Sequence, residues 1–205
     1  MAGAHEQLER AEHAEHAAHG KHADTNTFNK RIALLIAVLA LFLAIAETLG
    51  KGAQTDALNY NVEASNLWAF FQAKTIRQTA VRTAGEMVEL NRTQAVGPAL
   101  QEAIAKRLDA WSKTVARWES EPDTQEGRRE LAARAKKAEE KRDLALARYH
   151  HYEVSSAAFQ IAIVLASATV ITGAVALAWL SIGVGVVGLA FSGIGLLAPH
   201  AVHLF

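Results

Sequence analysis

Long apolar stretches alternate with a charged stretch along this chain, and the two kinds of stretch predict different surroundings. No Asp, Glu, Lys or Arg occurs between Val154 and Phe205. An earlier apolar run covers Ile32 to Leu49, with Glu47 as its only charged residue. A helix needs about 20 predominantly apolar residues to cross a bilayer. The pattern therefore predicts one membrane span within 30–50 and two more within 154–198.

The final uncharged stretch is long enough to hold both of the later spans. We expect it to divide near 176–183, giving one helix from about 156 to 175 and another from about 180 to 197. Pro199 closes the second helix, because proline has no amide hydrogen for a continuing helix. Residues 199–205 then form a short tail.

Residues 51–153 mix basic and acidic residues and have helical periodicity. Apolar residues recur at steps of three and four, the spacing of a helix that buries one narrow face. Gly97-Pro98 and Glu121-Pro122 interrupt this pattern, since glycine is a poor helix former and proline suits only a first turn. The segment is thus predicted to fold back as an antiparallel helical hairpin or coiled coil. The residues expected to pack on its inner face are Trp68, Phe71, Gln72, Ala73, Ile76, Ala80, Met87, Leu90, Leu131, Tyr149 and Tyr152.

The predicted fold class follows from these segments. It is an all-α membrane protein with three transmembrane helices and a long extramembrane helical hairpin or coiled coil between the first and second spans. Much of the inner face is alanine, which buries little apolar area per residue. We therefore expect self-association, in which several chains share their faces, and a monomeric bundle is the alternative.

Small residues in the last two spans also recur at steps of three and four. Gly183 to Gly188 matches the glycine pattern of dinucleotide sites, but that pattern needs a preceding strand and a following acidic residue. An uncharged span offers neither. Small residues let membrane helices approach closely, so two such faces are expected to meet, within one chain or between chains. The faces consist of Ser181, Gly185, Gly188, Ser192 and Gly195 on the last span, and of Ala162, Ala166, Thr169 and Gly173 on the preceding one.

The first 29 residues form a polar tail rich in His and Glu. His13, His16, His19 and His22 recur every third residue, and imidazoles are ligands for zinc, nickel or copper. Three residues of a helix turn through about 300°, so only neighbouring side chains in this series converge. Two interpretations stay open: a weak metal site, and a solvated tail whose charge changes near neutral pH.

Composition narrows the functional classes. The chain has no cysteine, which excludes a disulfide framework and a thiolate metal site. Its formal net charge is zero, so it lacks the basic footprint of a nucleic-acid-binding protein. No Ser, His and Asp residues are spaced as nucleophile, base and orienting group. We expect no enzymatic activity and no cofactor.

One segment carries a resemblance to a known family. Ser65–Arg77 contains Trp68–Lys74, which fits the pattern W-x-x-[FY]-Q-A-K, and Phe159–Ile163 opens the second span. These segments resemble an uncharacterised bacterial membrane family, domain-of-unknown-function family four-three-three-seven. The resemblance covers most of the chain and implies a bacterial inner membrane but no activity. It also implies basic residues between the last two spans, where this sequence has none.

Charges beside the spans predict an orientation. Lys30 and Arg31 precede the first span, and cytoplasmic flanks are enriched in such residues. This favours a cytoplasmic N-terminus and a periplasmic helical region. Lys141 and Arg142, together with Arg148, lie before the second span and favour the opposite arrangement.

Three functional hypotheses follow. The first is a non-enzymatic multi-pass membrane protein that serves as a self-associating scaffold or docks an unknown protein partner, its other partners being the lipid bilayer and further copies of itself. The second is an oligomeric channel or transporter subunit with Gln160, Ser167, Thr169 and Thr172 along its pore. The third is a metal-handling protein that uses the His-rich tail.

Overall fold

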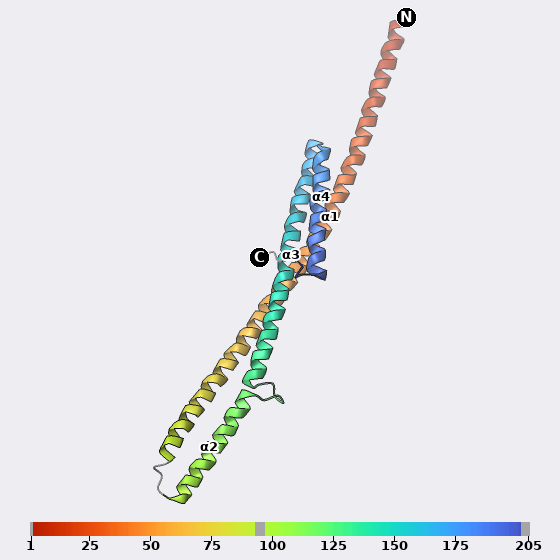
Figure 1. Cartoon of the computed structure of the whole chain (residues 1–205). Helices are drawn as coiled ribbons and strands as arrows, with labels where there is room; N and C mark the ends of the chain where they lie inside the picture. The colour runs from red at the N-terminus through yellow and green to blue at the C-terminus, as the bar shows by residue number, and fades with distance from the viewer. Residues whose placement is uncertain (1, 93–96, 202–205) are drawn as a thin grey trace. The chain divides into compact units, whose positions relative to one another are not determined.

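The structure, a computed structural model, describes the backbone of residues 2–92 and 97–201 and the side chains of 27–92 and 97–201. The described residues form four helices and no strand (Figure 1), which confirms the all-helical class. The helices are α1 (Ala2–Arg92), α2 (Pro98–Glu119), α3 (Arg128–Thr172) and α4 (Val175–Leu197). Thr27–Arg92 of α1, all of α3 and all of α4 are each long and apolar enough to cross a membrane.

The helix ends follow local backbone chemistry. Gly97 precedes α2 with a φ of 106°, a conformation that glycine adopts without a steric penalty, and Pro98 opens the helix. The boundary between α3 and α4 lies at Gly173, earlier than the expected 176–183. Gly173 has a φ of 69°, and its amide donates to the Thr169 carbonyl oxygen at 2.9 Å, which closes α3. Gly173 is therefore a helix-ending residue and lies outside both helices.

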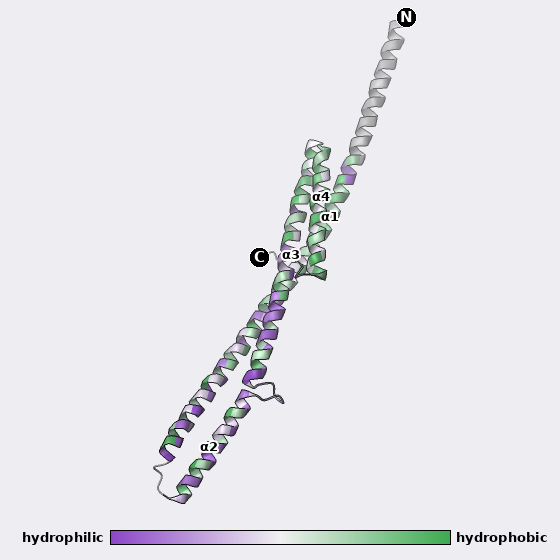
Figure 2. Ribbon diagram, in the orientation of Figure 1, coloured by the Kyte–Doolittle hydropathy of each residue, from purple (hydrophilic) through white to green (hydrophobic). Residues whose placement is uncertain are grey.

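The chain forms two compact units, and α1 and α3 contribute to both. We call Met1–Ala53 with Ala147–Phe205 the apolar unit, and Gln54–Leu146 the charged unit. Figure 2 shows that α4 is mostly hydrophobic, whereas hydrophilic and hydrophobic residues alternate along the charged unit.

The core of the apolar unit combines large residues with small ones. Leu39 and Ala46 of α1 form a buried cluster with Phe159 and Ala162 of α3. Phe42 stacks on Phe159 with ring centroids 5.9 Å apart. The alanines occupy little space beside the aromatic rings, so the helices can approach closely.

The contact between α3 and α4 uses hydroxyl groups as well as small residues. Ser181 donates a hydrogen bond to the Ala162 carbonyl oxygen at 2.7 Å, and Ser155 donates one to the Gly188 carbonyl oxygen at 2.7 Å. The two small-residue faces thus meet within one chain. Their buried members are Ala162, Ala166, Thr169, Ser181, Gly185, Gly188 and Gly195, and Ser192 is half-buried.

The C-terminal end of α4 lies against α3 at His151. Its buried Nε2 lies 3.0 Å from the carbonyl oxygen of Pro199, just beyond the end of α4. Tyr152 is also buried, and its Cβ lies 3.4 Å from the Cβ that a side chain at Gly50 would have. The half-buried Tyr149 also belongs to the apolar unit, so both tyrosines lie outside the charged unit in which their spacing predicted them to pack.

The apolar core of the charged unit lies between α1 and α3. Ala64 and Leu67 of α1 contact Leu131, Ala135 and Ala138 of α3, which runs antiparallel to α1. The half-buried Trp68 and Phe71, both expected to pack here, cover this core. In contrast, α2 has no buried residue. The α1–α2 end of the unit is thus the less tightly packed end.

Candidate partner-binding groove

Three helices of the charged unit meet at one buried amide. Gln78 of α1, 2% exposed, donates through Nε2 to the Val115 carbonyl oxygen at 3.2 Å and to Glu119 Oε2 at 3.1 Å. Its Oε1 accepts a hydrogen bond from Arg128 Nη1 at 2.7 Å. Each polar atom of the Gln78 side chain is therefore satisfied, and one side chain ties α1 to α2 and α3.

The α2–α3 connection is held by a second carboxylate. Glu130 accepts hydrogen bonds from Ser120 Oγ at 2.7 Å and from the Glu121 amide at 3.1 Å. Gly127 is required beside it, because a Cβ there would overlap the Glu130 carboxylate and the Glu121 backbone nitrogen. We call the contacts of Gln78, Glu119, Glu130 and their partners the polar junction.

Both carboxylates of the polar junction are held in their charged form. The hydrogen bond from Ser120 is the main cause that lowers the pKa of Glu130 below its usual value. The hydrogen bond from Gln78 is the main cause that lowers the pKa of Glu119, and Arg128 and Arg129 lower it further. The junction is therefore most stable when both groups are ionised.

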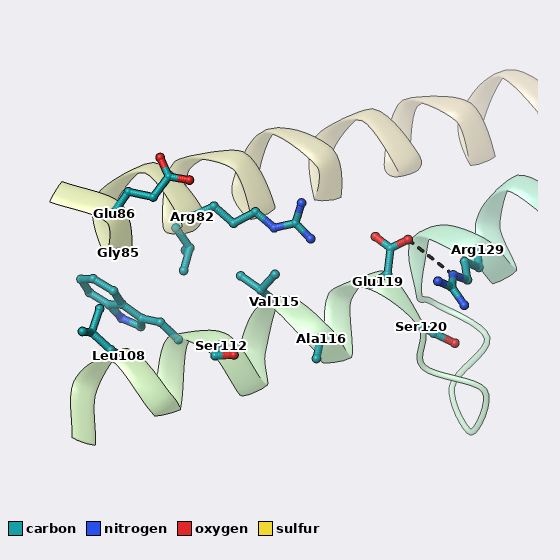
Figure 3. Close-up of a pocket in the computed structure, with 12 residues that line it drawn as sticks. Arg82, Gly85, Glu86, Leu108, Ser112, Val115, Ala116, Glu119, Ser120 and Arg129 are labelled. Atoms are coloured by element: carbon teal, nitrogen blue, oxygen red, sulfur yellow. Dashed lines mark ion pairs between the residues drawn. The ribbon is translucent and has the colours of Figure 1, made fainter. Parts of the chain in front are cut away.

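An open groove of about 650 Å³ lies beside the polar junction, between α1 and α2 (Figure 3). Half-buried apolar side chains form its floor, namely Val81, Leu108, Trp111 and Val115. A Cβ at Gly85 would lie 3.7 Å from Leu108 and 3.8 Å from Trp111, which is ordinary van der Waals distance.

Charged side chains of both signs form the rim of the groove. Arg82 and Glu86 of α1 are exposed, and Arg82 extends along the space between the two helices (Figure 3). On the other side, Arg129 Nε lies 3.4 Å from Glu119 Oε1. From Leu108 to Glu119 the lining covers about 16 Å of α2 at 1.5 Å per residue. The groove therefore suits an elongated, amphipathic ligand.

The structure places most of the residues expected on the inner face of α1 on the opposite, exposed side. Ile76 and Met87 are 69% and 61% exposed, and Leu90 is 75% exposed. Gln72, Ala73 and Ala80 are exposed too. The buried residues of α1 do recur at steps of three and four, but they occupy other positions than the predicted ones. We call this buried face the inner seam: Ala64, Leu67, Phe71, Lys74, Gln78, Val81, Gly85 and Val88.

Two polar residues explain why the apolar pattern of the sequence does not reveal the inner seam. Lys74 is buried, with Nζ 3.8 Å from a Glu121 carboxylate oxygen and 3.9 Å from one of Glu126. Gln78 is buried in the polar junction. Buried polar side chains need partners, and these partners come from residues more than 40 positions away or from the adjoining helix. A search for apolar residues alone therefore favours the exposed face of α1. The buried alanines Ala53, Ala57 and Ala64 do continue the spacing of the inner seam.

The alternative sites receive no added support from the described residues. The hydroxyls of Ser167, Thr169 and Thr172 each donate to a carbonyl oxygen one turn earlier in α3, and Gln160 is exposed. Among the side chains that the structure describes, no group of three or more His, Asp or Glu could hold a metal ion. The predicted metal ligands His13, His16, His19 and His22 lie outside the described side chains.

These features define an all-helical protein with three helices of membrane length and a charged helical unit. A family model described as "Domain of unknown function (DUF4337)" matches residues 28–198. The chain belongs to this family, and the resemblance seen in the sequence is confirmed. Neither a curated protein nor a solved structure matches the chain.

Proposed function

We propose that this chain is a non-enzymatic scaffold of the bacterial inner membrane, which self-associates and binds a second protein through its charged unit. The three apolar helices support the membrane location, because each is long enough to cross a bilayer. The charged unit lies outside the bilayer in this proposal, since Lys, Arg, Asp and Glu recur throughout Gln54–Leu146.

The groove between α1 and α2 is the observation that carries the docking role. Its floor exposes Leu108, Trp111 and Val115, and α2 contains no buried residue that would complete a core. A third helix laid along the groove would bury this apolar surface, the usual way in which an amphipathic helix is recognised. We assign the groove to a partner helix with an apolar face of about three turns, flanked by residues of both charges that would meet Arg82 and Glu86.

The proposed orientation rests on the residues beside the first span. Lys30 and Arg31 favour a cytoplasmic N-terminus, which would put the charged unit in the periplasm. Because the chain has no cysteine, a single Lys113→Cys variant tests this directly. A membrane-impermeant maleimide should label that thiol in spheroplasts as fully as in lysed cells. Labelling that requires lysis would reverse the orientation.

Site-specific photocrosslinking in intact cells tests the groove. A photoreactive residue at Ser112, which lines the groove, should yield a discrete adduct with a second protein whose crosslinked segment is an amphipathic helix. The neighbouring Lys113 ion-pairs with Asp109 on the exposed surface of α2 and does not line the groove, so it is the matched control.

A charged residue in the groove floor provides a second test in the same photocrosslinking experiment. Trp111→Glu should remove the Ser112 adduct and leave the amount of the protein in the membrane unchanged, because Trp111 is only half-buried. Equal adducts from Ser112 and Lys113 would show that the groove is not a specific site. An adduct that contains only a second copy of this chain would also overturn the assignment to another protein.

A further inference from the structure

Helix α1 has a second face with heptad spacing, and this face is exposed in the charged unit. Its apolar members are Val62, Ala69, Ala73, Ile76, Ala80 and Met87. Asn66 and Thr83 are its polar members and complete an unbroken alternation of four-residue and three-residue steps. We call these eight residues the outer stripe. All eight are exposed.

The outer stripe and the inner seam lie on opposite sides of one helix. Each residue of the outer stripe stands two positions along the chain from a residue of the inner seam, as Val62 does from Ala64 and Ile76 from Gln78. Two residues turn a helix by about 200°. A helix that packs in a single hairpin needs only one apolar face. The α2 and α3 helices cover the inner seam, so the same chain leaves the outer stripe without cover.

We propose that the outer stripe binds the outer stripe of a second copy, forming a parallel, in-register, two-stranded coiled coil of α1. Lipid does not suit this surface, because Glu63, Arg77 and Glu86 flank it along its length. The parallel direction rests on the proposed function: two copies inserted into one membrane in the same sense can align their α1 helices only in parallel.

The residues of the outer stripe fit such a pair. In heptad terms, Asn66, Ala73, Ala80 and Met87 take the a positions, and Val62, Ala69, Ile76 and Thr83 take the d positions. Alanines allow the two backbones to approach closely, and Ile76 and Met87 supply larger buried areas. Asn66 would meet Asn66 of the second copy, and an asparagine at an a position selects register and two strands at a cost in stability.

The charges beside the stripe are compatible with this register. In a parallel pair, each residue that precedes an a position faces the residue five places later in the other strand. Gln72 then faces Arg77 of the second copy, and Glu86 faces Asn91. Of the remaining flanking pairs, Ser65 with Phe70 and Thr79 with Ala84 carry no charge, and Glu63 faces the apolar Leu58. No like charges oppose one another along this stretch, and Arg77 and Glu86 each meet an amide that can hydrogen-bond to them.

Cysteine crosslinking of the full chain in membranes tests this pairing, because no native cysteine interferes. Ala73→Cys and Ala80→Cys place a thiol at two a positions, and mild oxidation should convert most of each variant into a covalent dimer. Lys113→Cys is an equally exposed control on α2 and should give at least tenfold less dimer. Adding Ile76→Glu to the Ala80→Cys variant should lower the dimer yield at least tenfold, since two carboxylates would then meet at a d position.

Two outcomes would overturn the pairing. The first is a dimer yield at Ala73 and Ala80 no higher than at Lys113. The second is a yield at Ala80 that Ile76→Glu leaves unchanged, because random collision in the membrane would give that result. These readouts do not depend on the adduct formed from Ser112. A groove that captures its partner with no crosslink at the outer stripe would therefore reject the pairing and leave the docking role intact.

Discussion

The apolar unit and the charged unit both expose large apolar side chains, but the surroundings of those side chains differ. In the apolar unit, exposed residues such as Val164, Ile171 and Trp179 lie in a stretch with no charged residue. A bilayer would cover all of them. In the charged unit, the exposed Ile76 and Met87 alternate with Arg and Glu, so neither lipid nor water is a favourable neighbour. Similar exposure thus fits a lipid environment in the apolar unit, whereas in the charged unit it fits the proposed cover by another protein surface.

The two units also differ in what holds their helices together. The apolar unit packs aromatic rings against small residues, as where Phe159 meets Gly188. In the charged unit, a small apolar core is followed by the polar junction and then by α2, which has no buried residue. Changes of side-chain size should therefore have the largest effect on stability in the apolar unit and in the small core of the charged unit. Changes of hydrogen bonding or charge should matter most at the junction.

The largest expected effect comes from the small core of the charged unit. Leu131 is fully buried, so Leu131→Ala should lower the free energy of unfolding by about 2–5 kcal/mol. Chemical denaturation followed by tryptophan fluorescence measures the loss. Leu100→Ala removes the same atoms from an exposed site and should cost less than about 1 kcal/mol. Equal losses would contradict the contrast between core and α2.

Glycines of α4 test the close packing of the apolar unit. A Cβ at Gly188 would lie 3.0 Å from Phe159, whereas one at Gly183 would have no atom within 4 Å. Gly188→Leu should therefore destabilise the detergent-solubilised protein by about 1–3 kcal/mol through overpacking. Gly183→Leu makes the same chemical change on an open side and should leave the thermal midpoint nearly unchanged. If Gly183→Leu were the more harmful, α4 would face the other way.

The polar junction should fail when its glycine gains a side chain. A Cβ at Gly127 would lie 2.7 Å from the Ser120 Cα, in addition to its overlap with the Glu130 carboxylate. Gly127→Ala should separate α2 from α3 and cost about 1–3 kcal/mol. The expected sign is increased protease cleavage within 120–127 with no change in the apolar unit. Unchanged cleavage would mean that the connection tolerates another conformation.

Acid should weaken the junction as well. Glu119 and Glu130 have lowered pKa values in the folded protein, so their contribution to stability is complete above the ordinary glutamate pKa of about 4.3. This contribution is lost as the pH falls below that value and through the lowered pKa. Thermal midpoints of the intact chain should thus fall with acidification in this range. Glu130→Gln should make that fall shallower, and an identical slope in the variant would remove Glu130 as a cause.

The smallest effect on folding is expected at the outer stripe. Ile76→Ser changes an exposed side chain and should shift the stability of the single chain by less than about 0.5 kcal/mol. The same change should reduce crosslinking through Ala80→Cys, because it removes apolar area only from the proposed dimer. A large loss of stability at concentrations where the protein is monomeric would show instead that Ile76 packs within its own chain.

Several features of this protein followed from the sequence by itself. The apolar stretches, the helical class and the interruptions before Pro98 and near Pro122 all depend on local properties, namely hydropathy, backbone freedom and the missing amide of proline. The small-residue stripes of the last two spans were also recognisable. Local chemistry determines such features because each depends on residues within a few turns of one another.

Only the tertiary structure decided which face of α1 is buried. Two stripes with the same spacing compete on this helix, and the more apolar one is exposed, while Lys74 and Gln78 are buried. Burial of a polar side chain becomes acceptable only when distant residues supply its partners, here Val115, Glu119 and Arg128 for Gln78. The period of a helix is thus a property of its sequence, but its phase depends on the helices that pack against it.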